Sequence, residues 1–179
     1  AEEAYVVYNG LKKITPKILD IADKNIFILV AGSGSTQMIY QKSGRIIYFE
    51  TFQVGALRIQ KNQNMNLESY KIIINGLGAN LYRSFGSNYG KDKIDKLIII
   101  NEDSLNIIKE NKIETIKKRD KTIYKITKQE FSNICDSVSK MSPQKLQNKY
   151  KLNLDAIQNS IITMLYLNRM IELIKPHKT

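Results

Sequence analysis

The sequence predicts an α/β domain in which helices pack on a mixed sheet of about five strands. Residues 26–54 contain three apolar segments separated by short glycine turns, which indicates an antiparallel three-strand meander. Further along the chain, helical and strand periodicities alternate, an order typical of a mixed sheet with packed helices. The length of 179 residues fits one domain, residues 1–179.

The first elements are set by changes in apolar periodicity. A helix is expected over residues 2–14, where apolar side chains recur at helical spacing. The continuous apolar run 26–31 predicts a strand buried on both faces. After the Gly32-Ser33-Gly34 turn, second and third strands are expected over residues 35–41 and 45–54.

Capping signals define several later elements, among them Thr127 and Glu130 as a capping box and Pro143 as a first helical residue. The charged residues 112–121 are expected to form a loop or an exposed hairpin. The expected elements are a helix over residues 66–86, a strand over 97–100, a helix over 104–111, a strand over 122–126, and helices over 128–140, from 143 and over 154–174. This order resembles the ribonuclease H-like half-domain of the sugar kinase, actin and heat-shock ATPase superfamily.

Composition excludes several classes of function. The net charge is +11, but 23 of the 28 basic residues are Lys and five are Arg, and Ile and Asn are abundant, which indicates codon bias. Because Arg makes most specific contacts to bases, nucleic acid is not expected as a partner. The one His and the one Cys, Cys135, exclude a disulfide framework and histidine-based metal chemistry, and Cys135 is expected in the core.

The expected location is the cytoplasm. No apolar run approaches the roughly 18 residues of a membrane span, so no membrane association is expected. The first residues, Ala1-Glu2-Glu3, carry no signal-peptide pattern, and we expect a processed product or an excised domain.

The turn between the first two predicted strands is the most informative segment. Gly32 and Gly34 would let backbone N–H groups approach an anion, with the hydroxyls of Ser35 and Thr36 as further donors. The alternative is a plain hairpin, because the Lys and following helix of a P-loop are missing.

Three segments together resemble the exopolyphosphatase and guanosine pentaphosphate phosphohydrolase (Ppx/GppA) family. Residues 1–10 (AEEAYVVYNG) resemble its "EEAR…G" segment, residues 32–37 (GSGSTQ) its "DIGGGSTE" loop, and residues 51–58 (TFQVGALR) its "S…GAVRL" segment. Residues 126–174 follow its later helices. The resemblance covers nearly the whole chain and corresponds to the second ribonuclease H-like domain, without the first.

The resemblance implies hydrolysis of terminal phosphoanhydride bonds in polyphosphate or guanosine pentaphosphate, with Mg²⁺. Glu3 matches the catalytic base of the family, and no residue is assigned to metal. The implied partners are a phosphate polyanion, the missing first domain and a second copy of the chain. The residues implied in phosphate binding are Gly32, Ser33, Gly34, Ser35, Thr36, Gln37 and Arg58.

Departures from the family pattern predict a degenerate active site. Tyr5 replaces an Arg, Val30 replaces an Asp, and Gln37 replaces a Glu. The second glycine loop of the family aligns best with residues 101–104, which bring two acids to a phosphate site, whereas residues 76–78 are a rival alignment.

Three hypotheses follow. The chain is the second-domain segment of a Ppx/GppA-like hydrolase, inactive or degenerate with a residual phosphate-binding loop. Alternatively, it is the excised half of an active exopolyphosphatase, or a basic polyanion-binding or scaffolding module.

Overall fold

The computed structural model describes residues 6, 8–10, 23–60, 66–111, 113–118 and 121–176. Residues 6 and 8–10 are helical, and the rest of the predicted helix 2–14 lies outside the described residues. The strands are β1 (Ile26–Ala31), β2 (Thr36–Lys42), β3 (Arg45–Phe52), β4 (Lys96–Ile100), β5 (Glu114–Lys118) and β6 (Lys121–Lys125). The helices are α2 (Ala56–Gln60), α3 (Leu67–Tyr89), α4 (Leu105–Glu110), α5 (Lys128–Ser139), α6 (Pro143–Tyr150) and α7 (Leu154–Ile174).

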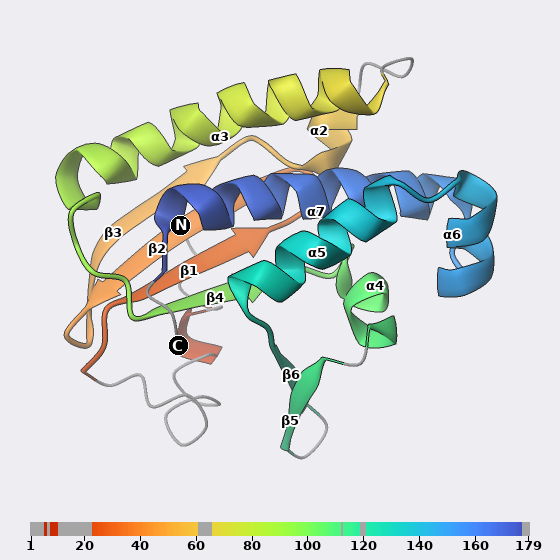
Figure 1. Ribbon diagram of the computed structural model, residues 1–179. Helices are drawn as coiled ribbons and strands as arrows, with labels where there is room; N and C mark the ends of the chain where they lie inside the picture. Colours follow the sequence, from red (N-terminus) through yellow and green to blue (C-terminus); the bar gives the residue numbers. More distant parts are fainter. Residues whose placement is uncertain are drawn as a thin grey trace.

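A four-stranded mixed sheet in the order β3-β2-β1-β4 forms the centre of the fold. The pairs β1–β2 and β2–β3 are antiparallel, which confirms the predicted meander, and β4 adds parallel to β1. Helices α3, α5 and α7 lie on one face of this sheet (Figure 1). The α/β fold class is therefore confirmed.

The expected fifth strand does not join this sheet. The predicted strand 122–126 corresponds to β6, which pairs with β5 in a separate two-stranded sheet. This ribbon extends away from the helices, as the hairpin alternative for residues 112–121 anticipated (Figure 1). Only two residues separate β5 from β6 in the sequence, and these two strands pair with each other. The periodicity of a short strand does not identify its partner.

The core fills both faces of β1, as its unbroken apolar run predicts. Phe27 and Leu29 are fully buried in the larger cluster on the helix side, whereas Ile26 and Ile28 belong to a smaller cluster on the other face. Because side chains alternate along a strand, a run without polar residues is the pattern of a strand covered on both sides.

Local signals set most helix ends. The Thr127–Glu130 capping box is present at the start of α5, and Ser142 caps α6 with Pro143 in its first turn. The helix predicted to end near Gly86 instead continues to Tyr89, because aromatic residues of its last turns pack together against the sheet. The short helix α2 was not predicted.

The described helices include none long and apolar enough to cross a membrane.

Candidate phosphate-binding site

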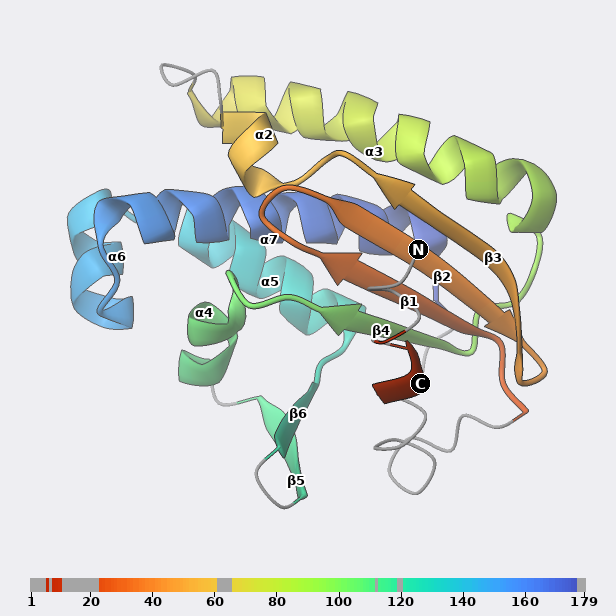
Figure 2. The same cartoon turned by 180° about the vertical axis from the view of Figure 1, so that it is seen from behind.

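The candidate site lies where β1 and β4 end. These strands are parallel, so their carboxyl ends meet at the same edge of the sheet (Figure 2). In open α/β sheets this edge is the usual place for a ligand. The glycine turn follows β1 and residues 101–104 follow β4, and the structure brings the two together. The Ser33 Oγ atom lies 3.3 Å from Asp103 Oδ2 and 3.5 Å from Asp103 Oδ1.

Asn101 fixes the relative position of the two segments. Its Nδ2 donates to the carbonyl of Ala31 at 2.6 Å, and its Oδ1 accepts from the backbone N–H of Ser104 at 2.8 Å. Asn101 thus satisfies an N–H at the start of α4, whereas the N-cap residue of α4, Ser104, makes no side-chain cap bond. A third element contacts this loop, because Ser160 Oγ of α7 donates to the carbonyl of Asp103 at 2.5 Å.

Helix α2 holds the carbonyl groups of the glycine turn. The N–H of Leu57 donates to the carbonyl of Ser33 at 2.9 Å, and Arg58 Nε donates to the carbonyl of Gly34 at 2.9 Å. Gly55 makes this contact possible, because a Cβ atom there would lie 2.5 Å from the carbonyl oxygens of Gly32 and Ser33. No larger residue fits between the turn and the start of α2.

This arrangement directs two backbone amides outward. The peptide bonds are trans, so each N–H points opposite to the carbonyl before it. The carbonyls of Ser33 and Gly34 point toward α2, and the N–H groups of Gly34 and Ser35 therefore point to the other side. Within the described ranges neither of these N–H groups has an acceptor. Two adjacent amides without an acceptor can receive an anion.

Gly34 is not required by the fold. Its φ angle is outside the left-handed region, and a Cβ atom built on it would meet nothing within 4 Å. Gly55 is the opposite case, since its side-chain space is taken by the turn itself. The glycines of the turn are the more conspicuous in the sequence, but Gly55 carries the steric constraint. The available signal for Gly55 was its position three residues after the third strand.

Two predicted site residues, Thr36 and Gln37, are buried on β2. Thr36 is fully buried, and its hydroxyl accepts from Tyr166 Oη at 3.0 Å and donates to the carbonyl of Val54 at 2.8 Å. Burial raises the pKa of Tyr166 to about 12, although the bond to Thr36 opposes this rise. Gln37 is 5% exposed and lies opposite Val30 on β1.

Arg58 is exposed at the rim of the site. Its Nε is engaged with the turn, and its Nη2 donates to Gln53 Oε1 at 3.0 Å. Glu3, the residue implied as catalytic base, lies outside the described residues, as do most of residues 1–10. Across the part of the chain that the structure describes, no group of three His, Cys, Asp or Glu could hold a metal ion.

The sequence matches no protein-family model and no curated protein. Solved structures, in contrast, match its fold over most of the chain. An exopolyphosphatase from Cytophaga hutchinsonii aligns with a TM-score of 0.69 at 10% identity, covering 88% of this chain and 52% of its own. The Aquifex aeolicus Ppx/GppA phosphatase aligns with a TM-score of 0.65 at 10% identity, covering 86% of this chain and 51% of its own.

The chain thus spans about half the length of the structures that it matches. This coverage is consistent with one of two domains, as the resemblance implied. At this level of identity the similarity establishes the fold, and the chain has the fold of about half of a Ppx/GppA phosphatase.

Proposed function

We propose that this chain is the phosphate-binding half of a Ppx/GppA-like protein whose catalytic site is degenerate. It would bind a phosphate chain at the glycine turn without hydrolysing it. The observation that carries this proposal is the pair of amides without an acceptor, Gly34 and Ser35, in a turn whose Ser33 hydroxyl contacts the Asp103 carboxylate.

Phosphate binding is supported by the donors of the turn. The amides of Gly34 and Ser35 have no acceptor among the described residues. Arg58, which binds the Gly34 carbonyl on the α2 side, adds a positive charge to the same turn. Hydrogen bonds to a charged group contribute about 1.5–3 kcal/mol each. The open space beside Gly34 leaves room for a ligand oxygen to approach the backbone.

Loss of hydrolysis is supported by the acid at Asp103. Two negative unit charges about 5 Å apart repel by about 3 kcal/mol at an effective dielectric constant of about 20. An anion on the amides of the turn would face such repulsion, because the carboxylate already lies against Ser33. Val30 and Gln37 supply no carboxylate at the positions where the family has one.

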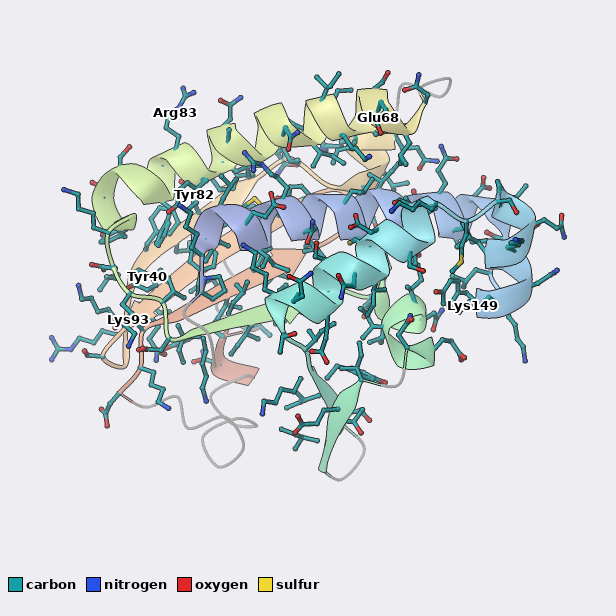
Figure 3. All side chains as sticks on the ribbon, viewed as in Figure 1. Tyr40, Glu68, Tyr82, Arg83, Lys93 and Lys149 are labelled. Atoms are coloured by element: carbon teal, nitrogen blue, oxygen red, sulfur yellow. The ribbon has the colours of Figure 1, made fainter. Side chains whose placement is uncertain are left out.

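Titration with tripolyphosphate tests phosphate binding. Amide shifts of Gly34 and Ser35, followed by ¹H–¹⁵N NMR, should move on binding, and Arg58→Ala should weaken binding about tenfold. Arg83→Ala is the matched control, because Arg83 carries the same charge and projects outward from α3 in Figure 3. Equal weakening by both variants would mean attraction by net charge, as expected of the basic scaffolding module, and would overturn the proposal.

A phosphate-release assay tests the proposed loss of hydrolysis. The longer protein that contains this chain should release no phosphate from polyphosphate or guanosine pentaphosphate in the presence of Mg²⁺. Turnover that Glu3→Ala abolishes would instead favour the excised half of an active exopolyphosphatase.

A further inference from the structure

A chain of buried hydroxyl groups runs from helix α7 to the base of the glycine turn. Tyr166 Oη donates to Thr36 Oγ1 at 3.0 Å, and Thr36 Oγ1 donates to the carbonyl of Val54 at 2.8 Å. Tyr166 is 2% exposed and Thr36 is fully buried, so water cannot replace either bond. The three residues are far apart in the sequence, and the two bonds join three separate segments.

Two members of this chain, Thr36 and Val54, lie beside the turn. Thr36 is the first residue of β2 and follows the turn directly. Val54 precedes Gly55, whose Cα packs against the carbonyls of Gly32 and Ser33. The bond between Thr36 and Val54 therefore holds together the two segments whose contact directs the carbonyls of the turn toward α2.

Helix α7 holds the second loop in the same way. Ser160 is 1% exposed, and its hydroxyl donates to the carbonyl of Asp103. Ser160 and Tyr166 are six residues apart, about 1.7 helical turns, so their side chains leave α7 about 120° apart. One helix thus contacts both loops of the candidate site through buried hydroxyls.

We infer that Tyr166 and Thr36 are positioning residues, which keep the amides of Gly34 and Ser35 directed outward. They contact no ligand and act through Val54 and Gly55. This inference rests on the proposed phosphate-binding function, but the geometry of the turn can be measured without any ligand.

The substitution Tyr166→Phe tests this inference, because it keeps the ring and removes only the donor. Tyr150→Phe is the matched control, since the Tyr150 hydroxyl is buried and without a partner among the described residues. The reporter is hydrogen exchange of the Leu57 amide, which is bonded to the carbonyl of Ser33. Exchange of the Ile74 amide, in the middle of α3, reports on unfolding of the whole domain.

We expect Tyr166→Phe to speed exchange at Leu57 about tenfold relative to Ile74, and Tyr150→Phe to leave this ratio unchanged. Thr36→Val, which removes both bonds, should speed exchange at Leu57 at least as much as Tyr166→Phe, and Thr36→Ser, which keeps a hydroxyl, should preserve the wild-type ratio. An unchanged ratio in Tyr166→Phe, or an equal rise in both tyrosine variants, would overturn the inference.

A tripolyphosphate titration of the same variants separates this inference from the proposed function. If the wild-type protein does not bind tripolyphosphate but the exchange ratio changes as expected, the positioning role stands and the phosphate-binding function fails. If the wild-type protein binds and Tyr166→Phe alters neither binding nor exchange, the positioning role fails and the function stands.

Discussion

The substitution Gly55→Ala should loosen the glycine turn and destabilise the domain. The new Cβ atom would lie 2.5 Å from the carbonyl oxygens of Gly32 and Ser33, whereas real Cβ atoms stay beyond 3.0 Å, so both oxygens must retreat by at least 0.5 Å. Both belong to the backbone and cannot rotate away as a side chain would. The retreat also lengthens the 2.9 Å bond from the N–H of Leu57 to the carbonyl of Ser33.

The expected loss follows from these two effects. Forcing extra atoms into a packed region costs about 1–3 kcal/mol, and a weakened hydrogen bond adds about 0.5–1.5 kcal/mol. We therefore expect Gly55→Ala to lower the free energy of unfolding by about 3 kcal/mol. For a protein of this length this corresponds to a fall in Tm of roughly 6–12 °C.

Urea unfolding followed by circular dichroism measures this loss, and Gly34→Ala is the matched control. A Cβ on Gly34 meets nothing within 4 Å, so this variant should lie within about 1 kcal/mol of the wild type. A Gly55→Ala protein as stable as Gly34→Ala would refute the argument that α2 clamps the turn.

Two further predictions concern side chains away from the site. Cys135 is 3% exposed and burial raises the pKa of its thiol to about 12, so it should react with a thiol reagent only after unfolding; rapid labelling of the native protein would contradict this burial. The backbone N–H and hydroxyl of Thr127 lower the pKa of Glu130, so the ionised Glu130 carboxylate stabilises the folded protein. This stabilisation is fully present above the carboxyl pKa of the unfolded chain and is lost as the pH falls through the lowered pKa of the folded protein. Glu130→Gln should remove this part of the acid dependence of Tm, and an unaltered pH profile would exclude it.

Elements with strong local signals could be predicted from the sequence. The run 26–31 matches β1, and the apolar face of residues 154–174 matches α7, because burial on both faces of a strand or on one side of a long helix leaves a clear period. The helix α2 could not be predicted, since five residues provide too few turns for a period. The strand that pairs with β6 could not be predicted either, because strand pairing depends on the tertiary fold.

The candidate site was predictable in part. The glycine turn marks the place, and the alignment of residues 101–104 with a second loop agrees with the contact between Asp103 and Ser33. The directions of Thr36 and Gln37 depend on the register of β2 against its neighbours, which a single sequence does not reveal. The position of Asn101 between two strand ends likewise follows from topology alone.

Tripolyphosphate affinity of Asp103→Asn tests the central claim most directly. This substitution keeps the size of the side chain and a hydrogen-bonding partner for Ser33 but removes the negative charge beside the turn. The account predicts that Asp103→Asn binds at least tenfold more tightly than the wild type, and that Gly34→Ala, whose methyl group occupies the ligand space, binds more weakly. Equal affinity in all three proteins would contradict the claim that the glycine turn is a phosphate site impaired by Asp103.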